Sequence, residues 1–157
     1  MCLNDLLCVI LLQFVALRWG GGVILLSESS YSIPIEQICR KILNRTTLDI
    51  FYLISNNRNL SKSDIAQIFK DYDPDPNAKV TKYRSTVELG IATLEGALFI
   101  ENWKDGQSER YILTPFGEAA DKIVTEMFDE VNDNMLLGCK IIPKKIEELQ
   151  AAKEVNA

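Results

Sequence analysis

The sequence predicts a mainly α-helical fold that contains one β-hairpin. Apolar residues recur at helical spacing in successive segments from residue 34 onward, a helix-capping signature precedes one of these segments, and an Asp-Gly dipeptide separates two runs of β-forming residues. The chain has 157 residues, enough for one domain with a helical extension. Its 47% of hydrophobic and 25% of charged residues exclude disorder over the whole length.

Two helices are expected first in this pattern. Residues 34–44 place Ile35, Ile38 and Ile42 on one helical face, with Pro34 in the first turn. Residues 46–55 are apolar almost all round, which predicts a central buried helix. A turn over residues 56–59 separates this helix from the next one.

A third and a fourth helix follow. Ser61 and Asp64 match a capping box and predict a short helix, which the prolines at 74 and 76 prevent from continuing. A longer helix is expected over residues 78–98. Its predicted buried face consists of Val80, Tyr83, Val87, Ile91, Leu94 and Leu98, and its opposite face begins with short polar residues and one lysine.

The hairpin is expected over residues 99–114, with its turn at Asp105-Gly106. Thr114 and Pro115 are typical of a helix start, and Ile123, Met127 and Val131 continue the apolar stripe of that helix. A last helix is expected from Pro143, with Ile146 and Leu149 on its apolar face.

The first 30 residues differ from the rest as an apolar extension. The run from Leu6 to Leu17 is too short to span a bilayer, and it lacks the basic start of a secretory signal. Three interpretations stay open: a packed or interfacial segment, a membrane tether, or residues translated only because the start codon is assigned too early. Since a glycine triplet separates the run from the domain, residues 1–26 are expected to be dispensable for folding and binding.

Composition excludes several kinds of function. The chain has no histidine, so histidine-based catalytic sites and histidine-ligated zinc are excluded. The four cysteines show no CxxC or CxC spacing, and no nucleophile elbow or phosphate loop is present. We therefore expect no enzyme, no cofactor and no metal. The net charge is −5, but residues 31–115 hold 11 basic and 11 acidic residues, so a local basic surface remains possible there.

The order of these elements resembles the winged helix-turn-helix domain of MarR-like, ArsR-like and PadR-like transcription regulators, including some small archaeal winged-helix proteins. The residues that carry the resemblance are the capped helix LSKSDIAQIF, the helix TKYRSTVELGIATLEGALFIE and the hairpin segment WKDGQSERYILTPFGEAA, within residues 45–131. The segment from Asp71 to Lys79 departs from the family because it is longer than the usual turn. The resemblance implies binding of double-stranded DNA, with the helix after that segment in the major groove.

Groove geometry then assigns the candidate DNA-binding residues. We expect Lys82 to donate to guanine O6 or N7, and Ser85 and Thr86 to hydrogen-bond a base or a phosphate, because outward residues at the start of such a helix face base edges. Lys82 and Ser85 are the expected readout residues. Lys82 has no acid within four residues to pair with it. Arg84 is expected at a phosphate, with a surface ion pair to Glu88 as the alternative. The full set is Lys62, Lys79, Thr81, Lys82, Arg84, Ser85, Thr86, Lys104 and Arg110.

The hairpin is expected to be structurally integral and only weakly involved in DNA contact, because Asp105 and Glu109 balance Lys104 and Arg110. Tyr83 and Trp103 are expected to pack rather than to stack on bases. The predicted architecture is thus an extension (1–30), a winged helix-turn-helix domain (31–131) and a C-terminal helical extension (132–157).

The functional expectation is a cytoplasmic, sequence-specific regulator that dimerises through the helices flanking the winged helix. One rival is a monomer in which those helices complete the core. The other is a winged-helix module that contacts proteins and does not bind DNA.

Overall fold

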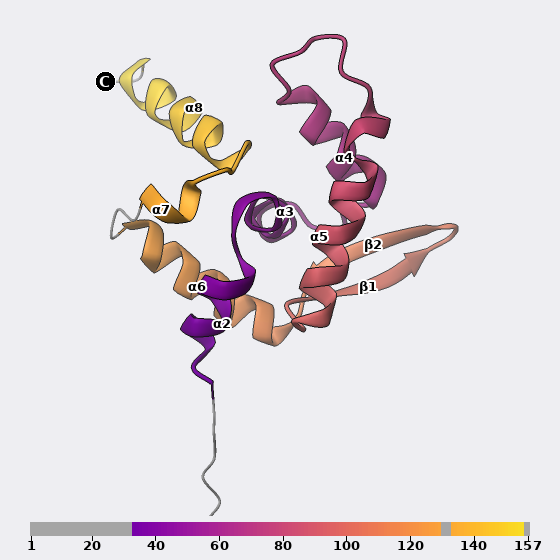
Figure 1. Cartoon of the computed structure of the whole chain (residues 1–157), viewed down its shortest axis with the longest axis vertical. Helices are drawn as coiled ribbons and strands as arrows, with labels where there is room; N and C mark the ends of the chain where they lie inside the picture. The colour runs from indigo at the N-terminus through magenta and orange to yellow at the C-terminus, as the bar shows by residue number, and fades with distance from the viewer. Residues whose placement is uncertain (1–32, 130–132, 156–157) are drawn as a thin grey trace, which may run out of the picture. The chain divides into compact units, whose positions relative to one another are not determined.

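The computed structural model describes residues 33–129 and 133–155 and contains a winged helix with flanking helices. Figure 1 shows α2 (Ile35–Ile42), α3 (Arg45–Asn56) and α4 (Lys62–Asp71), then the 3-10 turn η1 (Val80–Tyr83) and α5 (Arg84–Gly96). The hairpin strands β1 (Ile100–Asp105) and β2 (Ser108–Leu113) follow. The chain continues through α6 (Pro115–Asp129), α7 (Asp133–Leu136) and α8 (Ile142–Val155). The mainly α-helical fold with a hairpin wing is confirmed.

Local signals start several of these elements as expected. Ser61 caps α4: its hydroxyl accepts a hydrogen bond from the Asp64 backbone N–H, and the Asp64 carboxylate accepts one from the Ser61 backbone N–H. Thr114 precedes Pro115 at the start of α6, and its hydroxyl accepts a hydrogen bond from the Gly117 N–H at 3.0 Å. The predicted caps at both helices are confirmed.

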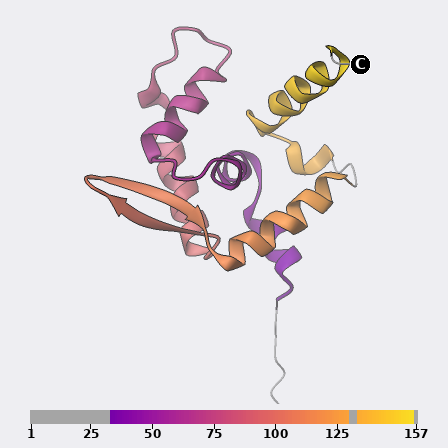
Figure 2. The same cartoon turned by 180° about the vertical axis from the view of Figure 1, so that it is seen from behind.

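The two strands pair antiparallel from Ile100 opposite Leu113 to Asp105 opposite Ser108, and Gly106 takes a positive φ of 64° in the turn between them. The hairpin projects away from the helices (Figure 2). One isolated bridge joins Tyr111 to Leu60, whose carbonyl accepts the Tyr111 N–H at 3.1 Å. This bridge ties the hairpin to the segment that precedes α4, a contact that the sequence pattern did not indicate.

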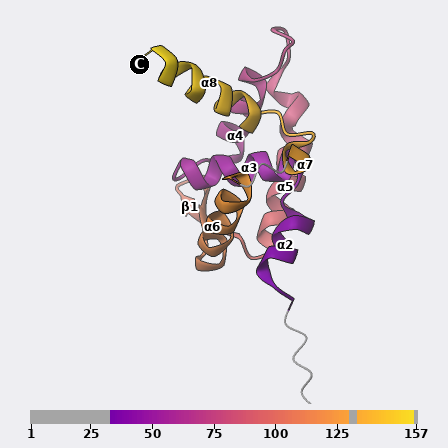
Figure 3. The same ribbon diagram turned by 90° about the vertical axis from the view of Figure 1, so that its left-hand side faces the viewer.

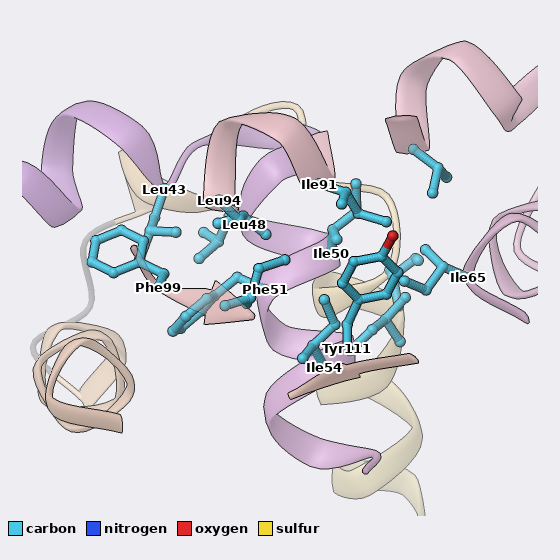
Figure 4. Packing of buried hydrophobic residues seen from close by; sticks show 14 of the residues in the cluster. Leu43, Leu48, Ile50, Phe51, Ile54, Ile65, Ile91, Leu94, Phe99 and Tyr111 are labelled. Carbon is cyan, nitrogen blue, oxygen red and sulfur yellow. The ribbon is translucent and has the colours of Figure 1, made fainter. Parts of the chain in front are cut away.

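The core surrounds α3, as predicted for a helix that is apolar almost all round. Leu48, Ile50 and Phe51 on α3 are buried against side chains of α5 and the hairpin (Figure 4). Phe51 lies 5.8 Å from Phe99, measured between ring centroids. One polar side chain, Asp49, is also fully buried on α3, and the sequence pattern gave no sign of that burial.

The predicted single helix over residues 78–98 is wrong at both ends. Residues 80–83 form a 3-10 turn, and the α-helix spans Arg84 to Gly96 only. Tyr83, Val87, Ile91 and Leu94 are buried as expected, but Leu98 is 68% exposed and has a positive φ of 61°. Leu98 therefore belongs to the sharp turn into β1 and not to the buried face of the helix.

The flanking helices pack against the core of the same chain. In Figures 1 and 3, α2 and α6 lie on one side of α3, and α8 lies on the other. Partly buried apolar side chains that pack against the core come from α2 (Ile35, Ile38 and Ile42), α7 (Met135 and Leu136) and α8 (Ile146). On α6, Met127 is buried as predicted, but the residue buried one turn earlier is Val124, and the predicted Ile123 is only half-buried. Residues 1–32, Val131 and the Leu149 side chain lie outside the described part, and so do the predictions made for them.

Candidate nucleic-acid interface

The chain from η1 into α5 presents a row of polar side chains to solvent. Thr81, Lys82, Arg84, Ser85 and Thr86 are all exposed, whereas the residues between and after them, Tyr83 and Val87, are buried. The Tyr83 ring packs against Phe69 of α4, with 5.7 Å between centroids. This packing fixes the start of α5 on α4, so that the polar row faces outward. The structure therefore brings these five of the predicted DNA-binding residues together on one surface.

Lys82 has a partner that sequence reasoning missed. Its Nζ lies 2.6 Å from Asp73 Oδ2, and the Asp73 side chain is only 3% exposed. The Tyr83 hydroxyl donates to the same oxygen, and the Asp75 backbone N–H donates to Oδ1 at 3.0 Å. Asp73 belongs to the long segment between α4 and η1, so this segment is fastened to the start of the polar row.

Both charges of this pair persist around neutral pH. The hydrogen bond from Lys82, with those from Tyr83 and the Asp75 backbone, holds the pKa of Asp73 well below its usual range. The same bond to Asp73 raises the pKa of Lys82 above 10.5. The stabilisation from an acid with a lowered pKa is lost as the pH falls through that pKa. The stabilisation from a lysine with a raised pKa is lost as the pH rises through that pKa. The ion pair is therefore intact between these limits.

Two further predicted cations form ion pairs that join α4 to the hairpin. Lys62 lies 3.1 Å from Glu109, and Arg110 Nη1 lies 2.9 Å from Asp64. Arg110 also donates to the carbonyl of Asn59 at 3.0 Å. The pKa of the Asp64 carboxyl is lowered, mainly by the hydrogen bonds from Ser61 and to a smaller extent by Arg110. Arg110 thus has a structural role at the base of the wing, beside the capping box of α4.

The other three predicted cations form no ion pair with the described residues. Among residues 33–129 and 133–155, Lys79, Arg84 and Lys104 make no ion pair, and the pair between Arg84 and Glu88 that was the alternative for Arg84 does not form. All three side chains belong to exposed residues. They are the cations of the set that can approach phosphates without breaking an internal contact.

An open hollow of about 510 Å³ lies between the start of α4 and the wing tip. Ser63 and Gln107 contribute to its wall beside the predicted residues Lys62 and Lys104. Hydroxyl, amide and ammonium groups are the donors that proteins use for DNA phosphates. Ser63 and Gln107 were missed from the sequence because they come together only when the hairpin lies against α4.

Trp103 is 42% exposed on β1, so the prediction that it packs is wrong, whereas the same prediction for Tyr83 is confirmed. Leu89, one turn beyond Ser85, is 72% exposed. Within the described ranges no group of three or more His, Cys, Asp or Glu residues is arranged to hold a metal ion. No described helix is long and apolar enough to cross a membrane.

Comparison with known proteins finds a similar solved structure. No family model matches the chain, and no curated protein matches it. Among solved structures, the chain is similar to MepR, described as a transcription regulator of the Staphylococcus aureus multidrug efflux pump MepA. The two share 16% identity at a TM-score of 0.43, over 99% of this chain and 98% of that one.

Proposed function

We propose that the protein is a regulator that binds double-stranded DNA in a sequence-specific manner, with the start of α5 in the major groove. The observation that carries the proposal is the outward row of Thr81, Lys82, Arg84, Ser85 and Thr86 on a helix start that is fixed to α4. In helix-turn-helix proteins the first residues of the second helix contact base edges. The exposed residues of this row are hydroxyl and cationic donors, which suits that position.

The proposed contacts divide into two groups. Lys82, Ser85 and Thr86 would contact base edges, because hydroxyls and lysine can donate to purine N7 and O6 acceptors. Arg84, Lys79 and Lys104 would contact phosphates, because no ion pair within the described part of the chain matches their charges. Lys62 and Ser63 line the hollow beside the wing, but Glu109 lines it too and pairs with Lys62, so a phosphate bound there by Lys62 would displace Glu109.

Replacing Arg84 by alanine should weaken binding to all DNA sequences alike. Each phosphate contact contributes about 0.9 to the slope of log K against log salt concentration, so the variant should show a slope smaller in magnitude by about 0.9. Fluorescence anisotropy over a series of salt concentrations measures this slope. The matched control is Lys122→Ala, which removes an exposed charge from α6. An Arg84→Ala protein with the wild-type slope would contradict the phosphate contact.

A second candidate function, a winged helix that contacts proteins and does not bind DNA, is favoured by the internal pairing of charges. Lys62, Lys82 and Arg110 each neutralise an acid of the same face. The discriminating experiment is selection from a random duplex library with the wild-type protein, followed by the salt titration. A regulator yields an enriched sequence and a steep salt slope, whereas a protein-interaction module yields neither.

We also propose a homodimer, since two copies related by a twofold axis can contact half-sites about one helical turn apart. Ile35, Ile38 and Ile42 stay partly exposed although they contact the core, so α2 retains apolar surface for a second copy. Light scattering at micromolar concentration should give about twice the chain mass of 17.7 kDa. A mass equal to one chain would instead support the monomer in which the flanking helices only complete the core.

A further inference from the structure

The ion pair between Lys82 and Asp73 is at odds with a simple DNA contact. A lysine that binds phosphate uses its full positive charge, and binding weakens as salt rises. Lys82 is the first of the three proposed base-contacting residues, yet an aspartate from the preceding loop cancels its charge. This arrangement needs an explanation that the proposed function alone does not supply.

The Asp73 carboxylate is fixed in place. It is 3% exposed and accepts hydrogen bonds from three donors: Lys82 Nζ, the Tyr83 hydroxyl and the Asp75 backbone N–H. Tyr83 is itself buried against Phe69. The anion therefore cannot turn away from Lys82 without disturbing the packing between η1 and α4.

The Lys82 ammonium group is bound by Asp73 and still has exposed N–H donors. Its side chain is 52% exposed, and an ammonium group carries three N–H donors, of which Asp73 accepts one. A lysine has a long flexible stem, and fixing it normally costs conformational entropy at the moment of binding. Here much of that ordering is already present before DNA arrives, and two donors remain available.

From this geometry we propose that Asp73 is a positioning residue that makes Lys82 specific for guanine. The inference rests on the proposed DNA binding and names the role of one residue pair within it. Asp73 directs the ammonium toward the O6 and N7 acceptors of one guanine. It also cancels the charge that would otherwise draw the flexible side chain to any phosphate. The pair thus contributes to sequence discrimination and little to salt-dependent affinity.

The test compares two neutralised aspartates in the full-length protein on a selected duplex that contains guanine and on an unrelated duplex. Asp73→Asn should raise affinity for the unrelated duplex, steepen its salt slope by about 0.9 and lower the ratio of specific to non-specific affinity about tenfold. Asp71→Asn is the matched control, because Asp71 is an exposed acid at the end of α4, just before the same loop, and its carboxylate contacts Gln67 and Lys70 instead. Equal ratios for the two variants would overturn the inference.

A second variant covers the case in which Asp73→Asn does not fold. Lys82→Met leaves Asp73 with Tyr83 and the Asp75 N–H, and it should weaken the guanine site about 5- to 150-fold with the salt slope unchanged. Replacing the guanine by 7-deazaguanine, which lacks N7, should weaken wild-type binding but leave Lys82→Met unaffected. A salt slope that falls by about 0.9 in Lys82→Met would make Lys82 a phosphate contact and overturn the inference.

Separate results test the DNA binding of the protein and the positioning role of Asp73. If the wild-type protein enriches no duplex, the proposed function is wrong and the inference falls with it. If the wild-type protein binds a selected site but Asp73→Asn behaves like Asp71→Asn, the DNA-binding function stands and the positioning role of Asp73 is wrong.

Discussion

Replacing Asp49 by alanine is expected to lower the free energy of unfolding by about 3 kcal/mol. The Asp49 carboxylate is fully buried on α3 and accepts hydrogen bonds from the backbone N–H groups of Lys140, Ile141 and Ile142, at 2.7, 3.1 and 3.1 Å. Removal of the acceptor strands N–H donors at the start of α8, and each buried unsatisfied donor costs about 1–3 kcal/mol. The variant no longer has to bury a carboxylate, which is a gain in stability. The net loss is therefore smaller than the summed cost of the three unsatisfied donors.

The loss should appear in urea unfolding followed by circular dichroism. Asp121→Ala is the matched control, because its half-buried carboxylate accepts one hydrogen bond, from Ser55, at 2.7 Å and should be worth only about 1 kcal/mol. Asp49→Asn keeps one carboxamide oxygen as acceptor and should fall between the two. If Asp49→Ala costs no more than Asp121→Ala, the start of α8 does not depend on this anchor.

The stabilisation by Asp49 should also depend on pH in a defined direction. Burial raises the pKa of Asp49 above 3.8, and the three backbone N–H groups oppose that rise without cancelling it. The folded protein therefore takes up this proton more readily than the unfolded chain does. The contribution of Asp49 grows as the pH falls through the raised pKa and is lost as the pH rises again.

The difference in stability between the wild-type protein and Asp49→Asn should accordingly be larger at about pH 4, near the ordinary pKa of an aspartate, than at about pH 7. The carboxyls of Asp64 and Asp73 have lowered pKa values and act in the opposite direction, but they are common to both proteins and cancel in the difference. A difference that shrinks on acidification would contradict the raised pKa.

Local signals predicted the local structure well. The capping box at Ser61 and Asp64, the Asp105-Gly106 turn and the Thr114-Pro115 start each depend on residues within three or four positions of one another. Such groups meet wherever the rest of the chain goes, so the sequence alone specifies them. The fold class followed because these local elements occur in a recognisable order.

Contacts between distant segments could not be predicted in this way. Lys82 was expected to be free because no acid lies within four residues, yet its partner Asp73 is nine residues away across a loop. Lys104 and Arg110 were expected to be balanced together by Asp105 and Glu109, but the shortest ion pair of Arg110 is to Asp64, 46 residues earlier. Helical spacing says nothing of partners brought together by a loop or by the docking of a hairpin, and these partners decide which cations of the candidate site are free.

The apolar stripes of the flanking helices show the same limit. Helical spacing placed Ile35, Ile38 and Ile42 on one face, and that face is apolar in the structure. The spacing did not say whether the face meets the same chain or a second copy. In the structure the side chains contact the core of their own chain and remain partly exposed, so one surface is shared between folding and the proposed dimer.

Replacing Gly117 by alanine is expected to lower the free energy of unfolding by about 2–3 kcal/mol. A Cβ at this position would overlap the backbone carbonyl oxygen of Phe99, and backbone cannot turn aside as a flexible side chain can. The first turn of α6 lies on the end of β1 at this point: the Gly117 N–H donates to Thr114 Oγ1, and the Thr114 N–H donates to the same Phe99 carbonyl at 3.1 Å. An added methyl group must therefore separate the helix from the hairpin.

The matched control is Gly96→Ala, the same substitution at the last residue of α5, where a Cβ would meet nothing within 4 Å. Alanine loses less conformational entropy in a helix than glycine, so this variant should be unchanged or more stable by up to about 1 kcal/mol. Thermal unfolding of both variants gives the comparison. Since the Phe99 ring lies 5.8 Å from that of Phe51 in the core, the damage at Gly117 should reach the packing of α3, and near-ultraviolet circular dichroism should change with it. Equal stabilities for the two variants would show that α6 does not rest on the Phe99 carbonyl.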